Sequence, residues 1–367
     1  MMNLTVCGAG NAGAAIAADC AMGGAEVTLF ELAEFEENIR PYKKQGGIVI
    51  SEDSDPAWKK TGFACLEKIT TDPDAAVDKA DVIMITVPAM HHTVFWDRIA
   101  PHLKDGQIVL FNTGYFGALR HARKRRELGT DVTLAESNIM PYLCSKRGGA
   151  IHIARHKRNF RVAAFPGSRT DRVYEIVRTI YPQYEKVPNV LDTNIASGGN
   201  PAFHVTLTIP IAGFYLDRYR GGKFYSDTTV MGGRLIEAYD RDRKKLSDCL
   251  GSTCYQTITE FERKSYEYEG RDIVEMLRKS EHIDWFATDV YLRQLAEEDI
   301  VYAYIPMVRL GEQLGVELPA IRSMTEVMGI MTGEDYWARG LCPDDLDVAG
   351  MNREELLAYV MSSPTEV

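Results

Sequence analysis

The chain opens with an apolar, β-prone run that leads straight into a glycine-rich turn and then into a strong helix former. The run is Leu4–Cys7, and Ala14–Ala18 begins the helix. The turn between them consists of Gly8, Ala9, Gly10, Asn11, Ala12 and Gly13. In a G-x-G-x-x-G turn, the first glycine allows the tight turn and the second lets the backbone approach a pyrophosphate. The third lets the new helix pack closely on the strand, and the positive end of that helix then faces the phosphates. The stretch therefore predicts a dinucleotide-binding strand–turn–helix, and the alternative is a glycine-rich turn in another α/β protein.

An acidic residue follows this turn at the distance that a dinucleotide site requires. The second predicted strand, Glu26–Phe30, ends on Glu31. An acid about 20 residues after the turn suits a ribose 2′-OH and repels a 2′-phosphate, so Glu31 favours NAD(H). NADP(H) is left open, because the basic residues Arg40, Lys43 and Lys44 lie downstream. Those three either supply a phosphate site or form a solvated basic patch.

The rest of the first half alternates strand-like and helix-like segments. Asp81–Val87 is a continuous apolar run, typical of a parallel strand that is buried on both faces, and Pro88 ends it. Ligands bind near the carboxyl ends of strands in open α/β sheets, so we expect Val87 and Pro88 to contact the cofactor. His91 and His92 follow this strand end, either near the cofactor or as bystanders without a proton role.

Further along, three expectations depend on local pattern alone. Ala150–Ala154 and Phe160–Ala164 are expected to pair as a hairpin, and Tyr184–Val187 to close the sheet. The basic run Arg120–Arg126 is interpreted as the exposed face of a surface helix, which places His121 at the surface.

The pattern changes near Val190 from alternating strands and helices to long helical segments. Five segments show apolar residues at helical spacing, namely Phe203–Tyr219, Thr229–Leu250, Tyr255–Tyr268, Tyr291–Leu314 and Pro319–Met331. We therefore predict an α/β protein with an N-terminal Rossmann-type doubly wound sheet at residues 1–188 and a C-terminal all-helical domain at 189–367. A cleft is expected between the two domains.

Composition and charge exclude several classes of function. A net charge of −10 disfavours nucleic acid as a partner, and no run approaches the ~20 apolar residues of a membrane span. The first strand starts almost at Met1, so no signal peptide is expected. The seven cysteines are odd in number and form no C-x-x-C pair. This pattern predicts reduced thiols in a cytoplasm, not a disulfide framework or a metal site.

His204 is the histidine whose position best suits proton transfer. It follows Asn200 by four residues at the start of the second domain, so both side chains can share one helix face. A nicotinamide enzyme needs a proton donor or acceptor near the atom that takes the hydride, and histidine suits that task near neutral pH. The alternative is a structural histidine near a helix start.

Matches along the chain resemble the octopine/nopaline (opine) dehydrogenase family. Beside the glycine turn they are Gly46-Gly47-Ile48, Asn112-Thr113-Gly114 with Gly117-Ala118, Ala135-Glu136-Ser137 with Pro141-Tyr142, Asn200-Pro201-Ala202-Phe203-His204, Gly233–Ala238 and Leu314–Pro319. The resemblance implies a reductive condensation of an amino acid with a 2-oxo acid such as pyruvate, with NAD(P)H as hydride donor.

The resemblance also implies the roles of particular residues. It places His204 as the proton-transfer group paired with Asp299, Asn200 at the substrate, and Arg293 as a clamp for a substrate carboxylate. The family pattern around the acid is altered here, because Gln294 replaces a tyrosine and an extra acidic residue is present, so Glu298 is a rival to Asp299. The amino acid, the oxo acid and the oligomeric state stay open, with a homodimer allowed.

Two other functions are compatible with this sequence. One is a reductase of 2-oxo acids that resembles 2-dehydropantoate reductase, which usually employs a lysine in the helical domain. The other is a nucleotide-binding sensor without turnover.

Overall fold

The computed structural model of the chain divides into two units. One comprises Met1–Val190 with the C-terminal segment from Ser362, and the other comprises Leu191–Met361. The residues described are 2–55, 57, 60–147, 149–215, 223–280 and 289–362. The sequence analysis places its boundary two residues earlier, between 188 and 189, and the cleft stays a prediction.

The first unit is built on an eight-stranded sheet with the order β12-β11-β8-β7-β6-β1-β2-β5. Its strands are β1 (Asn3–Cys7), β2 (Glu26–Phe30), β5 (Lys68–Thr70), β6 (Val82–Ile85), β7 (Ile108–Asn112), β8 (Thr133–Ser137), β11 (Phe160–Phe165) and β12 (Tyr184–Lys186). All neighbours are parallel except β8 and β11. The chain runs outward from β1 through β2 and then returns to β6 on the other side of β1. This reversal is the topological switch point where open α/β sheets bind ligands, and the glycine turn follows β1 there.

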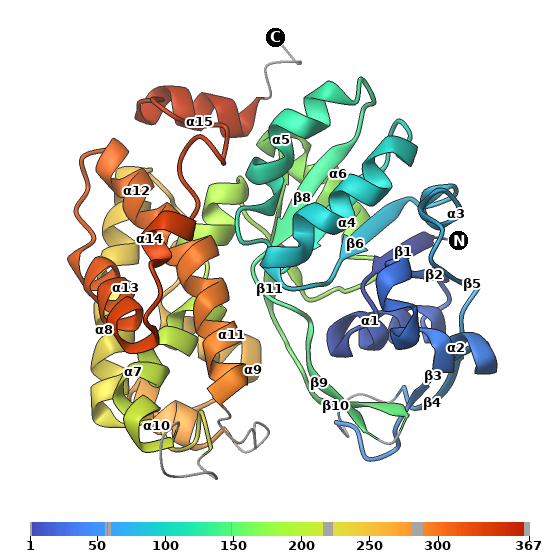
Figure 1. The fold of residues 1–367 in the computed structure, drawn as a ribbon, viewed down its shortest axis with the longest axis horizontal. Coiled ribbons are helices and arrows are strands. Elements are labelled where there is room, and N and C mark those ends of the chain that lie inside the picture. Colours follow the sequence, from blue (N-terminus) through green and yellow to red (C-terminus); the bar gives the residue numbers. More distant parts are fainter. Residues whose placement is uncertain are drawn as a thin grey trace. The chain divides into compact units, whose positions relative to one another are not determined.

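The helices of this unit cover the sheet and supply its short connections (Figure 1). They are α1 (Asn11–Met22), η1 (Ala33–Asn38), α2 (Arg40–Gln45), α3 (Pro73–Val77), η2 (Ala89–His91), α4 (His92–Ile99), η3 (Ala100–His102), α5 (Gly117–Glu127), η4 (Gly167–Arg169) and α6 (Thr170–Val177), with η marking 3₁₀ turns. α5 packs against β8 and β11, and α6 packs against β11 and β12. Every residue of β6 and β7 is buried, as the continuous apolar runs predict.

A second, four-stranded sheet corrects the expected hairpin. It has the order β4-β3-β10-β9 and contains β3 (Gly47–Ile50), β4 (Gly62–Cys65), β9 (Tyr142–Arg147) and β10 (Ala150–His156). β10 pairs with β9 and β3, while β11 joins β8 in the other sheet, so the predicted pairing of Ala150–Ala154 with Phe160–Ala164 is wrong. β3, β4 and β9 all pack against α1. This sheet therefore lies beside the helix that leaves the glycine turn.

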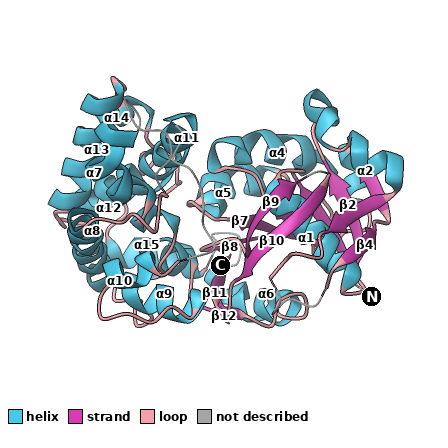
Figure 2. Cartoon of the chain, turned by 90° about the horizontal axis from the view of Figure 1, so that it is seen from below, coloured by secondary structure: helices cyan, strands magenta, loops and turns pink. Residues whose placement is uncertain are grey.

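The second unit is helical throughout its described part (Figure 2). Its elements are η5 (Asp192–Ala196), η6 (Asn200–Ala202), α7 (His204–Tyr215), α8 (Val230–Cys249), α9 (Ile258–Tyr266), α10 (Ile273–Arg278), α11 (Asp289–Asp299), η7 (Ile300–Tyr304), α12 (Ile305–Gln313), α13 (Pro319–Thr332), α14 (Tyr336–Arg339) and α15 (Arg353–Met361), with η5 and η7 as π turns and η6 as a 3₁₀ turn. Residues 216–219 of the first predicted helix lie outside the described residues. Among the helices that are described, none combines the length and apolarity that crossing a membrane requires.

The long helix predicted over Tyr291–Leu314 is broken into three parts. α11 ends at Asp299, the π turn η7 follows, and α12 begins at Ile305 with Pro306 in its first turn. Proline has no N–H to continue the helical ladder, so the backbone shifts its hydrogen bonding before Pro306. This irregularity lies directly after the acidic stretch that the sequence analysis singles out.

Candidate active-site residues

The glycine turn has the local geometry that a dinucleotide requires. Gly8 has φ +98°, and a Cβ added there would lie 2.3 Å from Cγ1 of Val87. A Cβ at Gly13 would lie 1.9 Å from the carbonyl oxygen of Gly8, so only glycine lets α1 approach the strand so closely. A Cβ at Gly10 would meet nothing within 4 Å, so this side of the turn is open.

The amino end of α1 is open to an anion. Its N-cap is Gly10, which forms no side-chain cap, and the first turn carries no acidic residue. Gly10 and Asn11 are both exposed. The N–H groups and dipole of this twelve-residue helix therefore suit a phosphate group.

Glu31 is bound to the turn from the end of β2. Its carboxylate accepts hydrogen bonds from the N–H of Ala9 at 3.0 Å and the N–H of Leu32 at 2.9 Å, and from Nδ2 of Asn38 at 3.3 Å. The side chain is buried, with 4% of the residue exposed. Glu31 thus lies beside the turn, as the sequence analysis expects, and its side chain is largely shielded from solvent.

Val87 and Pro88 follow the end of β6, next to the turn. Val87 packs against Gly8, and Pro88 is exposed. Thr86 Oγ1 donates to the carbonyl of Cys7 at 2.8 Å, which ties the two strand ends together. The loop after β6 therefore borders the glycine turn.

The histidines after this strand differ in their surroundings. His91 is exposed, whereas His92 is buried with its Nε2 3.1 Å from the carbonyl oxygen of Val87. His121 is buried too, and its ring stacks on Phe111, so its predicted surface position is wrong. Burial lowers the pKa of His92 well below its usual range and lowers the pKa of His121 to about 3. Both are neutral core residues. His121 and Arg125 lie on the buried face of α5, so the basic run is only in part exposed, at Arg123 and Lys124.

In the second unit, His204 and Asp299 meet. His204 is the first residue of α7, Asp299 is the last residue of α11, and Nδ1 of the ring lies 2.9 Å from Oδ2 of the carboxylate. Only 5% of the His204 side chain and none of the Asp299 side chain is exposed. This separation is within ion-pair distance, and the contact is an ion pair when the imidazole is protonated. The neighbouring Glu298 is half-buried.

Aromatic residues enclose this pair. The His204 ring lies 6.2 Å from that of Phe224, and Tyr239 stacks on Tyr304 with ring centroids 5.1 Å apart. The Tyr304 hydroxyl donates to the carbonyl of Pro201 at 2.8 Å, which joins η7 to the segment before α7. Burial raises the pKa of both tyrosines, and the Asp299 charge adds to that shift.

Asn200 and Arg293 stand apart from the ion pair. Asn200 lies in η6 and is half-buried, so the helix that it was expected to share with His204 begins only at His204 itself. Arg293 is exposed on α11, and its guanidinium has no hydrogen bond or ion pair within the described part of the chain. Its donors are thus available for a carboxylate.

Comparisons with known proteins cover both units. A family model described as "NAD/NADP octopine/nopaline dehydrogenase, alpha-helical domain" matches residues 186–332. The opine dehydrogenase of Arthrobacter sp. (strain 1C) is 27% identical over 350 residues, which cover 94% of this chain and 95% of the relative. The helical unit thus matches the octopine/nopaline dehydrogenase family, and the chain as a whole is similar to an opine dehydrogenase.

Solved structures show the same fold as this chain. Octopine dehydrogenase in complex with NADH and agmatine matches with a TM-score of 0.79 at 16% identity, covering 97% of this chain and 98% of that one. The 2-dehydropantoate 2-reductase of Geobacter metallireducens GS-15 matches with a TM-score of 0.61 at 11% identity, covering 90% and 100%. The predicted fold class, a Rossmann-type sheet followed by a helical domain, is confirmed.

The N-terminal unit also matches a nucleotide-binding domain. A model described as "Acetohydroxy acid isomeroreductase, NADPH-binding domain" matches residues 3–135, which include the glycine turn. The open face at Gly10 and the uncapped end of α1 fit the phosphates of a dinucleotide.

Two further residues near these sites have no signal in the sequence. Lys146, on β9, reaches the glycine turn, and Arg243, on α8, is buried among the carbonyl groups that precede η6. Both form hydrogen bonds with residues that are distant in the sequence: Lys146 and Ala9 are 137 residues apart, and Arg243 and Ile195 are 48 residues apart. Local spacing carries no information about such contacts.

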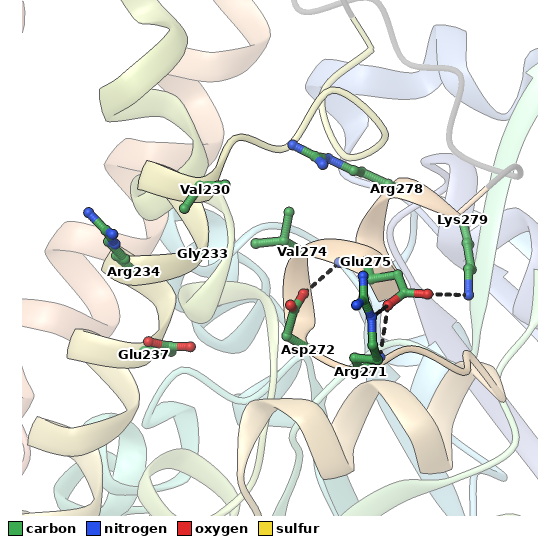
Figure 3. Close-up of a pocket in the computed structure, with 10 residues that line it drawn as sticks. All are labelled: Val230, Gly233, Arg234, Glu237, Arg271, Asp272, Val274, Glu275, Arg278 and Lys279. Atoms are coloured by element: carbon green, nitrogen blue, oxygen red, sulfur yellow. Dashed lines mark hydrogen bonds and ion pairs between the residues drawn. The ribbon is translucent and has the colours of Figure 1, made fainter.

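A hollow of about 410 Å³ lies between α8 and α10 in the helical unit (Figure 3). Its lining includes Arg234 and Glu237 from α8 and a charged group on and before α10. Within that group, Glu275 binds Arg271 at 2.8 Å and Lys279 at 2.9 Å, as the dashed lines of Figure 3 mark. These charges satisfy one another, so we assign this hollow no ligand.

Proposed function

We propose that this protein catalyses the reductive condensation of an amino acid with a 2-oxo acid, and that the oxo acid is pyruvate. It is an NAD(P)-dependent oxidoreductase of the opine dehydrogenase type, which acts on CH–NH groups. The observation that carries the proposal is the buried contact of 2.9 Å between His204 and Asp299, two residues from separate helices. A histidine whose one ring nitrogen is held by a carboxylate has the arrangement of a general acid–base pair.

His204 moves the proton in this proposal. Asp299 occupies Nδ1, so Nε2 is the atom that exchanges a proton with the substrate. The substrate amine first adds to the carbonyl carbon, and one of its protons passes to the carbonyl oxygen to give a carbinolamine. Protonated Nε2 then gives a second proton to that hydroxyl group, which leaves as water, so that a protonated imine is formed. The resulting imine is reduced at its carbon, and the bound nicotinamide supplies the hydride. Asp299 stabilises the imidazolium before the transfer.

The two carboxylates of the product need donors. Arg293 offers a planar guanidinium whose N–H groups can bind a carboxylate in bidentate fashion, and Asn200 offers an amide. We propose that both bind or orient substrate. Glu31 favours NAD(H) over NADP(H) by its charge, with NADP(H) still accepted.

The cellular setting is proposed from the cysteines. All seven cysteines are free in the structure, and Cys7 and Cys20 are buried. We propose a cytoplasmic protein on this ground, and the homodimer stays a prediction.

A substrate matrix tests the proposal. Pyruvate, 2-oxobutyrate, oxaloacetate and 2-oxoglutarate are combined with the common amino acids, and oxidation of NADH and of NADPH is followed. Oxidation that requires an added amino acid supports opine synthesis, and oxidation with the oxo acid alone identifies a 2-oxo acid reductase instead. Cofactor binding without oxidation in any combination identifies a nucleotide sensor.

A further inference from the structure

The second sheet places a lysine on the glycine-rich turn. Nζ of Lys146 donates to the carbonyl of Ala9 at 2.6 Å, and its backbone N–H donates to Oδ1 of Asn11 at 3.2 Å. The ammonium also lies 5.5 Å from the centre of the Tyr42 ring, which belongs to α2. The ammonium thus contacts the turn and α2, and the backbone of β9 forms a further hydrogen bond with the turn.

This cation and Glu31 flank the same residue. Glu31 accepts from the N–H of Ala9, while Lys146 donates to the carbonyl of Ala9. Partial burial lowers the pKa of Lys146, and the Glu31 charge opposes that shift. Glu31 is buried and surrounded by donors, whereas Lys146 is exposed. The charge that this side of the turn presents to a ligand is therefore positive.

Two of the three basic residues downstream of Glu31, Arg40 and Lys43, have acidic partners of their own. Arg40 forms an ion pair with Glu37, and Lys43 forms one with Glu36 at 2.7 Å. Both pairs are on the surface of η1 and α2, and their carboxylates already balance their charges. Lys146 has instead the Ala9 carbonyl as its partner, so its charge stays available to an anion.

We propose that Lys146 is a specificity-determining residue of the cofactor site and that its ammonium binds the 2′-phosphate of NADP(H). The acid at the end of β2 marks the place of the adenosine ribose in a fold of this class. Ala9 contacts both that acid and Lys146, so both charges border the place where the ribose would bind. The ammonium then forms charge-assisted hydrogen bonds with a 2′-phosphate and offsets the repulsion from Glu31. This inference rests on the proposed function only in placing a dinucleotide at the turn.

Two nucleotides that differ only in the 2′-phosphate test the proposal. Calorimetry measures the binding of 2′,5′-ADP and of 5′-AMP to the full chain, to Lys146→Met and Lys146→Arg, and to Lys43→Met as a matched control. Lys146→Met should lower the affinity for 2′,5′-ADP by about 10- to 100-fold, since a hydrogen bond to a charged group contributes on that scale. The affinity for 5′-AMP should change by less than about threefold, and Lys146→Arg should retain most of the affinity for 2′,5′-ADP. Lys43→Met should bind both nucleotides like the unsubstituted chain.

The other outcomes overturn the proposal in distinguishable ways. If Lys146→Met loses affinity for both nucleotides equally, the lysine acts on the 5′-phosphate or on the fold of the turn. Binding of 5′-AMP without 2′,5′-ADP by the unsubstituted chain means that no 2′-phosphate site exists. Absence of opine synthesis together with the expected affinities contradicts the proposed function and still supports the role of Lys146.

Discussion

At the scale of single residues, the sequence predicts the ion pair but not its neighbours. His204 and Asp299 are expected partners by family resemblance, and the structure brings them to 2.9 Å in one unit. Glu31 is found at the turn as expected, because the spacing between β1 and β2 is a local property. Lys146 has no such local signal, since it reaches the turn from β9, a strand that the sequence analysis does not predict.

Removing the charge of Asp299 tests its pairing with His204. Asp299→Asn keeps the size of the side chain but no longer stabilises the imidazolium, so kcat should fall by about 10²–10⁴-fold. Steady-state kinetics with NADH, pyruvate and an accepted amino acid measure the change. Glu298→Gln is the matched control, and its kcat should stay within about threefold. A larger loss in Glu298→Gln than in Asp299→Asn would reverse the assignment.

Alanine substitutions at Gly13 and Gly10, two of the three glycines of the turn, should affect stability differently. Gly13→Ala places a methyl 1.9 Å from the Gly8 carbonyl oxygen, so α1 must move and the free energy of unfolding should fall by about 1–3 kcal/mol. Gly10→Ala meets no atom within 4 Å and should leave stability unchanged within about 0.5 kcal/mol. Urea unfolding of both variants measures this difference, and equal stability would contradict the close approach of α1.

At the scale of elements, local patterns predict most strands and helices but not their long-range pairing. β2 has the predicted bounds, Glu26–Phe30, because a compact apolar run lies between turn residues. The hairpin is wrong because the partner of β10 is β9, whose half-exposed and polar side chains give no strand pattern. The broken helix before α12 shows likewise that one proline outweighs an apolar repeat.

The buried hydrogen bonds of Arg243 join α8 to the segment before η6, so this segment should depend on α8 for its stability. From α8, Arg243 donates to the carbonyl groups of Ile195 at 3.0 Å and Ser197 at 2.7 Å, and it binds Asp240 at 2.6 Å. Arg243→Met leaves these buried groups without their donor, so the free energy of unfolding should fall by about 3–5 kcal/mol.

The neighbouring lysine supplies the control for that variant. Lys244 pairs with Asp248 on the exposed face of α8, and Lys244→Met should cost less than about 1 kcal/mol. Urea unfolding of both variants measures the contrast. If Arg243→Met and Lys244→Met have similar free energies of unfolding, Arg243 does not stabilise the segment before η6.

At the scale of the whole molecule, buried histidines set the response to acid. Burial lowers the pKa of His121 to about 3 and of His156 to about 4, and lowers that of His92 as well, whereas an unfolded histidine titrates near 6.5. Between about pH 6.5 and 4 the unfolded chain therefore binds more protons than the folded one. Stability should fall as the pH falls through this window, by up to about 1.4 kcal/mol per pH unit for each histidine.

Urea unfolding from pH 7 to 4.5 measures this slope. His121→Gln removes one of the three groups, so its stability should depend less steeply on pH than that of the unsubstituted chain. Identical slopes for the two proteins would contradict a neutral, buried His121.

The central claim concerns the proton on His204, and turnover of His204→Ala tests it most directly. With NADH, pyruvate and an accepted amino acid, the account predicts a kcat about 10²–10⁴-fold below that of the unsubstituted protein. The affinity for NADH should stay within about threefold, because the glycine turn belongs to the other unit. Turnover like that of the unsubstituted protein would contradict the claim.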